Sequence, residues 1–484
     1  MDHELKDLQP HSLWHYFSAL CEIPRPSKKE AKATAFVRDF AITQGLDYTV
    51  DQTGNVIIRK LASPGMENRT GVVLQAHLDM VPQKNKDVDH DFEKDPIKAY
   101  VDGDWVKAKG TTLGADNGIG VAAILAVLAS KDIVHGPLEA LFTVDEESGG
   151  IGANELQPGL LNGSVLLNLD TEEEGVLYIG CAGGIFATTT FPYTAEPSGK
   201  DFEGFKVNLT GLKGGHSGLD INLGLGNANK LLNRFLWTSA RSYGLRLSAV
   251  EGGDMPSAIP REASAIVAVP SSKADEWKKS VSEFQATISS ELEGVESGIC
   301  ITAEQIECPV TVMSQQSQDN ILHVIYALPN GVSRMITNLP ELVETSVNLG
   351  IVKSDDHQVE VVCLILSSVD SAKEDLSNNI IATCALAGAT TVLHDSFPEW
   401  NPNFDSGILK IMNGIYQKQY GSPAQVQVIH GGLECAVFVI TYPGIDCISF
   451  GPTIKNPHSP DEKVNIPSVV RFWDYLVETL KNVL

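Results

Sequence analysis

The sequence predicts an α/β protein in which helices cover both faces of a mostly parallel sheet, with an α+β domain inserted into it. Short apolar segments, such as 71–76 and 138–144, alternate with helical segments near both ends of the chain. Buried strands that alternate with helices are typical of a parallel sheet. Between about 186 and 395, longer segments alternate apolar and polar residues, which is typical of half-buried strands and indicates a second kind of sheet.

In the N-terminal part, residues 12–45 predict helices that are interrupted at 23–26 by two prolines. The polar, acid-rich stretch 84–105 predicts a long loop. An apolar, alanine-rich stretch predicts a helix at 118–130. Strands are expected at 55–59, 71–76, 138–144 and 165–169.

The remaining elements divide the chain into domains. We expect a split α/β domain, 1–185 and 396–484, around an inserted domain at 186–395, because the α/β pattern returns after the middle of the chain. In the insertion, strands are expected at 205–209, 263–269, 298–305 and 359–367, and helices at 226–241, 274–292 and 318–327. After it, we expect strands at 426–429 and 447–450 and a closing amphipathic helix at 469–483.

The composition argues against several classes of function. The chain of 484 residues carries 36 Lys and Arg against 61 Asp and Glu, a formal charge of −25. Such acidity argues against nucleic acid and anionic membranes as partners, because both attract cationic surfaces. The eight cysteines form no C-x-x-C pair, the N-terminus lacks a signal-peptide pattern, and no apolar run approaches the roughly 20 residues of a membrane span. We expect a soluble, cytoplasmic protein with reduced thiols.

The first candidate metal ligand is His77, in the motif Gln75-Ala-His77-Leu-Asp79 at the end of a predicted strand. Residues two apart share one face of a strand, so Asp79 is placed to hydrogen-bond the imidazole of a metal-bound His77. Such a carboxylate fixes the tautomer of the ligand and raises its basicity. An ordinary His and Asp where a strand meets a loop explain the motif equally well.

The second candidate is Asp116, in the glycine-rich segment 111–120 directly before the predicted helix. An N-cap is the commonest role of Asp in that place, and the spacing alone favours it. The alternative is a carboxylate held by an unusual backbone so that its two oxygens bridge two cations.

Three adjacent acids, Asp145, Glu146 and Glu147, follow another apolar strand and precede Gly149 and Gly150. Acid runs are usually solvated turns, but here the glycines turn the chain sharply where the sheet ends. The acids can then divide the chemistry, with Glu147 as a metal ligand and Glu146 as a base. Side by side, they repel each other unless cations neutralise them.

Asp170 ends a further apolar strand, and His458 lies between prolines in Asn456-Pro-His458-Ser-Pro460. Each has an ordinary explanation when taken alone, as part of a solvated loop or as a structural histidine. The whole set is more specific, because α/β enzymes place their sites at the carboxyl ends of parallel strands.

Two histidines and three carboxylates suit a pair of Zn²⁺-like ions. Asp116, Glu147 and Asp170 supply three negative charges against the four positive charges of two divalent ions, and the surplus matches a bound hydroxide. Two-metal hydrolases hold their ions about 3.5–4 Å apart and lower the pKa of bound water to about 7. The residues therefore favour a two-metal hydrolase.

Taken together, these motifs resemble the co-catalytic zinc exopeptidases that include the carnosinases, peptidase T and acetylornithine deacetylase. The resemblance covers nearly the whole chain and implies a lid domain that dimerises in many relatives. It is carried, in order, by QAHLDMVPQKN, TTLGADNGIG, FTVDEESGG, NLDTEEEG, GLKGGHSGLDI, SAIPREA, LPNGVSRM, HGGLECAVF and GPTIKNPHSPDE.

The resemblance implies two Zn²⁺ ions per chain, with Co²⁺ or Mn²⁺ as alternatives. His77 and Asp170 would hold one ion, and Glu147 and His458 would hold the other. Asp116 would bridge them, often with a cis peptide bond to the next residue.

It also implies roles around the metal ions. Asp79 would orient His77, and Glu146 would be the general base that later protonates the leaving amine, a proton transfer worth about 10²–10⁴-fold in rate. His216, in the glycine-rich motif of the insertion, would complete the oxyanion site when the lid closes, from its own chain or from a partner's. A loop histidine flanked by turn-forming glycines is the ordinary alternative for His216.

Further residues are candidates for substrate binding. Arg334 is a natural partner for a substrate carboxylate, because its guanidinium binds both oxygens, although a surface arginine is as good an explanation. The family has Asn where Ser257 stands, and the shorter hydroxyl reaches less far toward a substrate. Glu434 and His430 are expected to line the pocket, with Glu434 available to a substrate amino group.

The expected function is zinc-dependent hydrolysis of dipeptides, with a preference for Xaa-His that includes β-alanyl-histidine (carnosine). A dinuclear-metal deacylase or tripeptidase is the alternative on the same metal centre. A metal-binding protein without catalysis is a third class, and the presence of Glu146 and Asp79 argues against it. The expected partners are a small dipeptide and a second copy of the chain.

Overall fold

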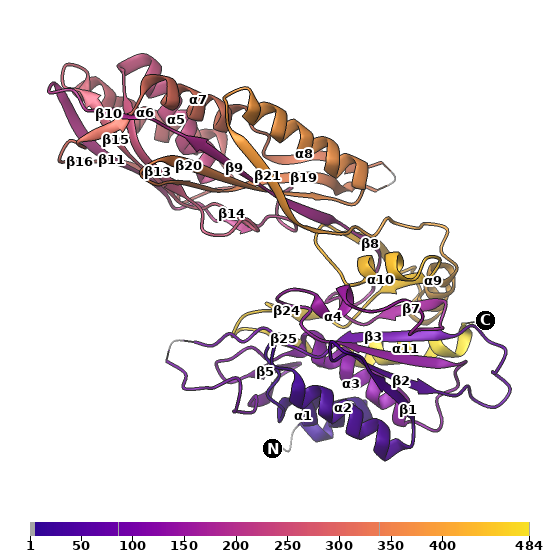
Figure 1. The fold of residues 1–484 in the computed structure, drawn as a ribbon. Helices are drawn as coiled ribbons and strands as arrows, with labels where there is room; N and C mark the ends of the chain where they lie inside the picture. Colours follow the sequence, from indigo (N-terminus) through magenta and orange to yellow (C-terminus); the bar gives the residue numbers. More distant parts are fainter. Residues whose placement is uncertain (1–4, 86, 338, 484) are drawn as a thin grey trace. The chain divides into compact units, whose positions relative to one another are not determined.

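The computed structural model describes residues 5–85, 87–337 and 339–483, which form two compact units (Figure 1). The first unit contains the described residues of Met1–Cys181, Trp400–Val428 and Leu433–Leu484, and the second those of Ala182–Glu399 and Ile429–Gly432. The chain therefore passes from one unit to the other four times.

Within the described residues, an eight-stranded sheet forms the centre of the first unit. Its order is β1-β2-β6-β3-β7-β23-β8-β22, and the labels β1, β2, β3, β7 and β8 rise in this order in Figure 1. The four central strands, β6, β3, β7 and β23, run parallel, whereas β1, β2 and β8 pair antiparallel. The strands are β1 (Asp47–Val50), β2 (Val56–Lys60), β3 (Val72–His77), β6 (Leu138–Thr143), β7 (Val165–Asn168), β8 (Val176–Cys181), β22 (Gln425–Ile429) and β23 (Asp446–Ser449).

Helices pack in two groups around this sheet. In the first group, α3 packs on β3 and α1, and α2 packs on β1 and β2; in the second, α9 and α10 pack on β23, and α11 packs on α9. Every residue of β3, β6 and β7 is buried, as expected for strands covered on both faces. The helices are the 3₁₀ turn η1 (Leu5–Asp7), α1 (His11–Cys21), α2 (Ala31–Gln44), α3 (Ala115–Ala129), α4 (Ile151–Asn154), α9 (Gly407–Tyr420), α10 (Cys435–Thr441) and α11 (Ile466–Asn482).

The predicted mixed α/β class is confirmed, with the parallel character concentrated in the four central strands. The long loop predicted at 84–105 is wrong in its second half. There, β4 (Ala99–Asp102) and β5 (Trp105–Ala108) form a hairpin that pairs with β25 (Lys463–Asn465), next to β24 (Ile454–Lys455). The acidic residues before the hairpin are typical of a loop, and the strand that pairs with the hairpin lies more than 350 residues later.

The second unit is an antiparallel sheet covered by helices. The described strands follow the order β16-β11-β15-β13-β19-β20-β9-β21, with β18 beside β19. Helices α5–α8 pack on it, and Phe205 of β11 meets Trp277 of α6 in its core, with 4.8 Å between the ring centres.

The described part of the second unit contains more strands and helices than the sequence predicts for it. Its strands are β9 (Gly183–Pro192), β10 (Ala195–Pro197), β11 (Phe202–Thr210), β12 (Gly215–His216), β13 (Arg246–Gly252), β14 (Ala258–Ile259), β15 (Ala263–Pro270), β16 (Cys300–Ile306), β17 (Thr311–Met313), β18 (Gly331–Ile336), β19 (Leu339–Ser354), β20 (Gln358–Ser367) and β21 (Thr390–Phe397). Its helices are α5 (Ala228–Tyr243), α6 (Ala274–Glu291), α7 (Gln315–Ala327) and α8 (Asp370–Ala385).

The structural units differ from the predicted domain limits at 185/186 and 395/396. Residues 182–185 and 396–399 group with the second unit, because β9 begins at Gly183 and β21 ends at Phe397 in its sheet. The short segment Ile429–Gly432 joins the same unit.

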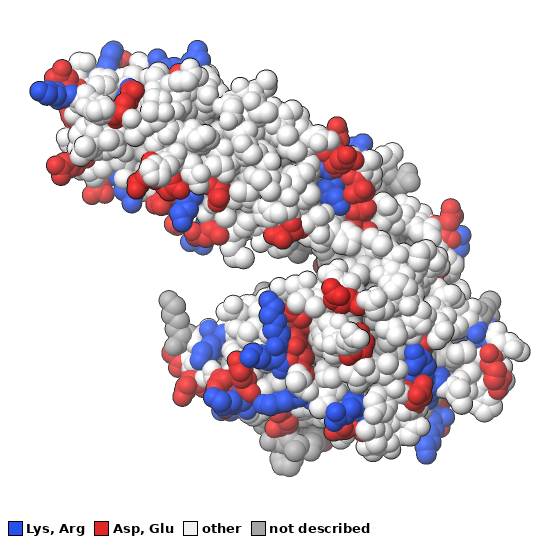
Figure 2. Space-filling model, in the orientation of Figure 1, with Lys and Arg blue, Asp and Glu red and all other residues white. Residues whose placement is uncertain are grey.

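The surface is acidic but mixed. Figure 2 shows basic side chains interspersed among acidic ones on the visible face of each unit. Among the described helices, none combines the length and the hydropathy that a membrane crossing requires.

Candidate metal centre

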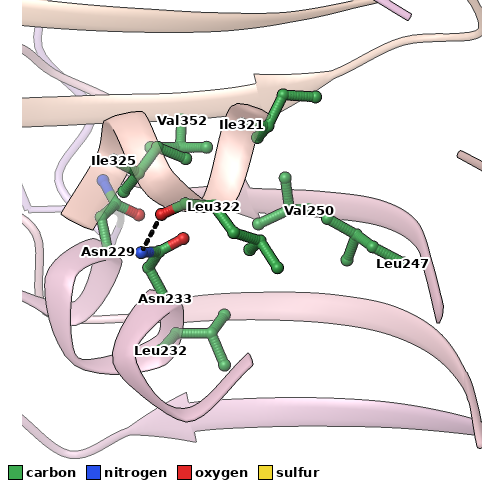
Figure 3. Close-up of a pocket in the computed structure, with 9 residues that line it drawn as sticks. All are labelled: Asn229, Leu232, Asn233, Leu247, Val250, Ile321, Leu322, Ile325 and Val352. Atoms are coloured by element: carbon green, nitrogen blue, oxygen red, sulfur yellow. Dashed lines mark hydrogen bonds between the residues drawn. The ribbon is translucent and has the colours of Figure 1, made fainter. Parts of the chain in front are cut away.

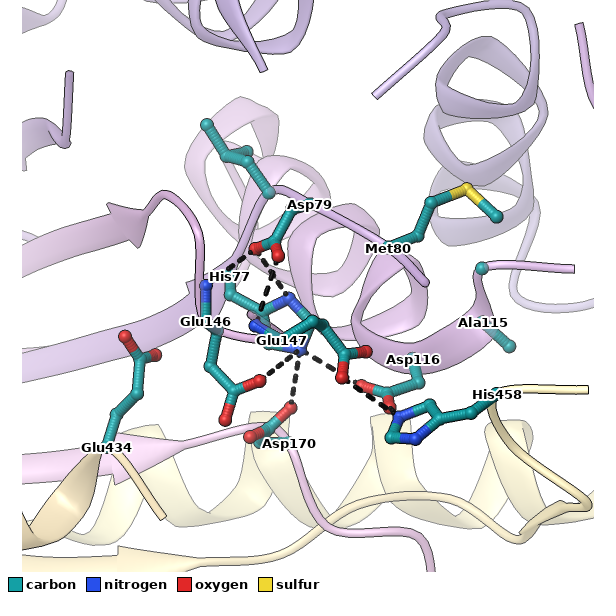
Figure 4. A network of polar contacts seen from close by, with 12 residues as sticks. His77, Asp79, Met80, Ala115, Asp116, Glu146, Glu147, Asp170, Glu434 and His458 are labelled. Atoms are coloured by element: carbon teal, nitrogen blue, oxygen red, sulfur yellow. Dashed lines mark hydrogen bonds and ion pairs between the residues drawn. The ribbon is translucent and has the colours of Figure 1, made fainter. Parts of the chain in front are cut away.

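The candidate ligands of the first unit follow the carboxyl ends of its central strands. His77 is the last residue of β3, Glu147 lies four residues after the end of β6, and Asp170 lies two residues after the end of β7. Because these strands are parallel neighbours, their carboxyl ends lie at one edge of the sheet, and the three side chains meet there (Figure 4).

Asp116 stands between the two histidines. One of its oxygens, Oδ1, lies 3.0 Å from His77 Nε2, and the other, Oδ2, lies 3.1 Å from His458 Nε2 (Figure 4). The backbone explains this placement: Asp116 has non-helical dihedral angles inside α3, and its peptide bond to Asn117 is cis. The N-cap favoured by the spacing is wrong, because Gly114 occupies the cap position of the helix.

The remaining ligands complete two groups that share Asp116. Asp170 Oδ1 lies 3.2 Å from His77 Nε2, and Glu147 Oε2 lies 3.0 Å from His458 Nε2. The potential ligand atoms of His77, Asp116 and Asp170 lie within 4.8 Å of one another, and so do those of Asp116, Glu147 and His458.

The spacing within each ligand group suits a metal ion. A tetrahedral zinc ion with bonds of about 2.1 Å keeps neighbouring ligand atoms about 3.4 Å apart, close to the spacings found. The second oxygen of Glu147 is buried and has no hydrogen-bond partner among the described residues, so it has ligand capacity to spare. Burial raises the pKa of Glu147 and of Asp170, because it destabilises their ionised forms. Bound cations would offset this destabilisation.

Asp79 supports His77 from behind. Its Oδ1 lies 3.3 Å from His77 Nδ1, so the outward Nε2 remains directed at the two carboxylates. The backbone amides of Glu146 and Glu147 donate to Asp79 at 3.0 and 3.1 Å, and Ser27 Oγ donates at 2.8 Å. Although burial opposes ionisation, these donors and His77 lower the pKa of Asp79 to about 2, so it remains a carboxylate.

Glu146 lies beside the ligands without joining the closest contacts. Its Oε2 is 4.0 Å from His77 Nε2, farther than the oxygens of Asp116 and Asp170. Burial raises the pKa of Glu146 well above its usual range, and the charge of His77 opposes this only in part. A carboxyl group that holds its proton more tightly than usual is suited to accept and return a proton.

Two residues that the motif analysis missed hold the loop of Asp116. The buried carboxylate of Glu462 accepts the backbone amides of residues 113, 114, 115 and 116 at 2.7, 3.0, 2.8 and 3.3 Å. The buried Arg25 donates to the carbonyl oxygens of Leu78 and Asp79 at 3.0 and 2.8 Å and to that of Gly114 at 2.5 Å. For Glu462, the sequence offers one signal, its position four residues after the candidate ligand His458. Nothing in the sequence singles out Arg25.

A model of peptidase family M20/M25/M40 matches residues 73–482. The chain belongs to this peptidase family. Cytosol non-specific dipeptidase of Escherichia coli is 46% identical to it over 480 residues, 99% of each chain. A crystal structure of aminoacylhistidine dipeptidase from Vibrio alginolyticus has 46% identity, a TM-score of 0.90, and coverage of 100% of this chain and 99% of that one. A tripeptidase from Staphylococcus aureus shares the fold at 17% identity, with a TM-score of 0.62 and coverage of 98% and 99%.

These similarities confirm the resemblance carried by the motifs, and they extend it to aminoacyl-histidine dipeptidase (peptidase D) among the M20 peptidases. The five candidate metal ligands, Asp79 and Glu146 all lie within the residues matched by the family model.

Glu434 is the one substrate-binding candidate in the same unit of this M20 peptidase. It is 4% exposed and accepts hydrogen bonds from Gln75 Nε2 at 2.6 Å and Thr143 Oγ1 at 2.8 Å. Burial raises its pKa to about 8, and a cation bound beside it would lower that pKa and keep the carboxylate ionised near neutral pH. In Figure 4, Glu434 stands at the Glu146 end of the ligand cluster, opposite the end where His458 lies.

The second unit holds the other candidates and brings two of them together. His216 pairs with Ala258 between β12 and β14, next to Ser257. Its Nδ1 accepts the backbone amides of Gly218 and Leu219 at 3.0 and 3.1 Å, so in the neutral ring the proton lies on Nε2.

Arg334 and His430 occupy other parts of this unit. The Arg334 side chain is 56% exposed, and its Nε lies 2.5 Å from Glu344 Oε1. His430 is buried, and its Nε2 lies 2.7 Å from Ser346 Oγ. Burial lowers the pKa of His430 to about 4, which keeps the ring neutral at physiological pH.

Proposed function

We propose that this M20 peptidase is a zinc-dependent dipeptidase that prefers Xaa-His substrates, β-alanyl-histidine included. The observation that carries the proposal is the pair of ligand groups that share Asp116, with one oxygen facing each histidine. The similarity over 99% of both chains to a relative named as a dipeptidase supports the substrate class.

Five residues would hold two Zn²⁺ ions, or Co²⁺ or Mn²⁺ in their place. His77 and Asp170 are proposed for one ion, Glu147 and His458 for the other, and Asp116 for both. Bound zinc supplies Lewis-acid polarisation of the scissile carbonyl and an acidified water molecule.

The protein's own contribution to the proton transfers is Glu146. Its carboxylate lies within 4.0 Å of His77 Nε2, near enough to the ligand cluster to receive a proton there. Its raised pKa lets it retain that proton until the amine departs. Asp79 keeps His77 in the tautomer that presents Nε2, because it faces the other ring nitrogen at 3.3 Å.

The two ends of a dipeptide would be read by different residues. Glu434 is proposed to accept the substrate amino group, and Arg334 to bind the substrate carboxylate through its guanidinium. His216 would donate from Nε2 to the developing oxyanion, with Ser257 as a further substrate contact. We propose the second unit as the lid that brings these residues to the substrate.

We also propose a cytoplasmic homodimer whose partners are small peptides, with neither nucleic acid nor a membrane among them. The acidic composition supports the exclusion of nucleic acid and membranes, and the similarity to the cytosol non-specific dipeptidase of Escherichia coli supports the compartment.

The test combines metal analysis with a substrate panel. The purified protein should contain two zinc ions per chain and hydrolyse alanyl-histidine and β-alanyl-histidine faster than other dipeptides, tripeptides and N-acetyl amino acids. Faster hydrolysis of tripeptides or N-acetyl amino acids would assign the protein to the other peptidase or deacylase activities of this scaffold. Metal-loaded protein that binds dipeptides and hydrolyses none would rule out the proposed enzyme.

A further inference from the structure

A row of polar side chains crosses the otherwise apolar centre of the first unit's sheet. Gln75 in β3, Asn168 in β7 and Ser449 in β23 are direct partners in the paired strands. All three are fully buried. Because buried polar groups need hydrogen-bond partners, such a row has to be satisfied by neighbouring side chains.

The hydrogen bonds along this row run in one direction. Ser449 Oγ donates to Asn168 Oδ1, and Asn168 Nδ2 donates to Gln75 Oε1 at 2.5 Å. With its oxygen so engaged, Gln75 directs its amide nitrogen to Glu434 Oε2 at 2.6 Å and to Thr143 Oγ1 at 3.1 Å. Thr143 donates to the same oxygen of Glu434 at 2.8 Å. The row therefore ends on one carboxylate oxygen, which it holds with two donors.

The other oxygen of Glu434 is left without a donor. Oε1 is buried and has no hydrogen-bond partner within the part of the chain that the structure describes. A buried carboxylate oxygen is costly to leave unpaired, so this atom is suited to a donor that arrives with a ligand. Among the groups that a peptide carries, its terminal ammonium is the charge-assisted donor that fits best.

The row is also fixed relative to the metal ligands. Gln75 lies two residues before His77 on β3. Asn168 is the last residue of β7 and lies two residues before Asp170. Side chains two residues apart in a strand share a face, so Gln75 and His77 project to the same side of the sheet. One strand therefore positions both a proposed ligand of the metal ion and the donor that orients Glu434.

We propose that Gln75 and Asn168 are positioning residues that fix Glu434 as the acceptor for the free amino group of the substrate, and so select peptides with an unblocked N-terminus. This inference rests on the proposed dipeptidase function and names the part of the substrate that Glu434 reads. The ligand is a primary ammonium two or three bonds from the scissile carbonyl carbon, as in α-aminoacyl and β-alanyl peptides.

The experiment compares alanyl-histidine with propionyl-histidine, which has the same size and scissile bond but no ammonium. The readouts are kcat and KM for each, the Ki of propionyl-histidine as a competitive inhibitor, and zinc affinity by calorimetry. In Glu434→Gln, kcat/KM for alanyl-histidine should fall about 30-fold, since a charge-assisted bond becomes a neutral one. In Gln75→Met, it should fall about tenfold, mainly through KM, because Glu434 loses one of its two donors.

The two substrates separate positioning from general damage. For propionyl-histidine, kcat/KM and Ki should change less than twofold in both variants, and zinc affinity should stay within twofold. Thr143→Val, which keeps the shape of the side chain, should give a smaller change in the same direction and serves if Gln75→Met does not fold. Gln318→Met is the matched control: Gln318 is a fully buried glutamine of the second unit, and its loss should lower Tm without changing the ratio of the two substrates.

Three outcomes would contradict these proposals, and they are distinguishable. Equal losses for both substrates, or losses that follow weakened zinc binding, would make Gln75 merely structural. A wild-type enzyme that hydrolyses both substrates alike would remove the selection for a free amine while leaving the peptidase activity intact. A metal-loaded wild-type protein that hydrolyses neither would overturn the proposed dipeptidase function itself.

Discussion

The two units both bury amide side chains, but they use them differently. In the second unit, Gln318 bonds the backbone on both sides, donating to Leu245 O at 3.0 Å and accepting from Leu247 N at 2.6 Å. In the first unit, the Gln75 side chain bonds other side chains and ends on Glu434. A side chain that bonds backbone supports the fold, whereas one that bonds a carboxylate beside a ligand cluster sets the direction of that carboxylate.

The same contrast holds for cavities and charges. In the second unit, a cavity of about 10 Å³ lies between α5 and α7 among aliphatic side chains and two asparagines, enough for about one water molecule (Figure 3). At the surface of this unit Glu291 pairs with Arg234, and its buried Glu296 accepts backbone amides. In the first unit, acids and imidazoles converge at one sheet edge, so function is concentrated where buried charge would otherwise destabilise the fold.

The largest expected effect concerns the shared ligand. Asp116→Ala should remove the bridge between both ligand groups, so metal analysis should find less than one zinc ion per chain and turnover should be undetectable. Asp319→Ala, at a half-buried acid of the second unit, is the matched control and should retain both ions. Full zinc content in Asp116→Ala would show that the two groups bind metal independently of that carboxylate.

Removal of the proposed base should separate binding from chemistry. Glu146→Ala should keep two zinc ions and dipeptide affinity, while kcat falls about 10²–10⁴-fold, the usual contribution of a positioned general base. The measurements are metal content, Kd for alanyl-histidine and kcat in the same preparation. Turnover near the wild-type level would exclude Glu146 as the base.

A support residue should have an intermediate effect. Glu462→Gln leaves one acceptor oxygen where the carboxylate now accepts four backbone amides, so the loop of Asp116 loosens. Zinc affinity measured by calorimetry should fall about 10–100-fold, as for other residues that orient metal ligands. Unchanged zinc affinity together with a lower Tm would limit Glu462 to a role in stability.

The smallest expected effect lies in the second unit and depends on pH. Burial lowers the folded-state pKa of His430 to about 4 from an ordinary 6.5, and the nearby His216 acts in the same direction. The folded protein thus binds this proton less tightly than the unfolded chain, so stability is fully present above pH 6.5 and is lost as the pH falls toward 4. The loss should approach about 3 kcal/mol. Urea unfolding of wild type and His430→Gln at pH 7 and 4.5 measures it, and identical pH dependence in both proteins would exclude His430 as the cause.

Sequence reasoning reached those parts of the site that local patterns encode. The candidate ligands His77 and Asp170 end or closely follow apolar strands, and parallel strands bring their carboxyl ends together, so their place at the edge of the sheet was predictable. The role of Asp116 was not predictable from spacing, because the unusual backbone at 116–117 is set by a loop held by Glu462, more than 340 residues away.

Other features escaped prediction because their signal is weak or distant. The hairpin β4–β5 follows an acidic stretch, and its pairing partner β25 lies near the C-terminus. Gln75 did leave a signal, a single amide inside an otherwise apolar strand, but its significance depends on Asn168 standing opposite it. No local pattern specifies that register before the strand order is known.

The four passages of the chain between the units have a consequence for biosynthesis. Four of the five proposed metal ligands are synthesised before the first passage after Cys181, whereas His458 and the supporting Glu462 follow the last passage after Gly432. More than 250 further residues are therefore synthesised after the first four proposed ligands and before His458. Since domains fold as units during translation, the first unit should complete its metal centre only after the second unit has already been made.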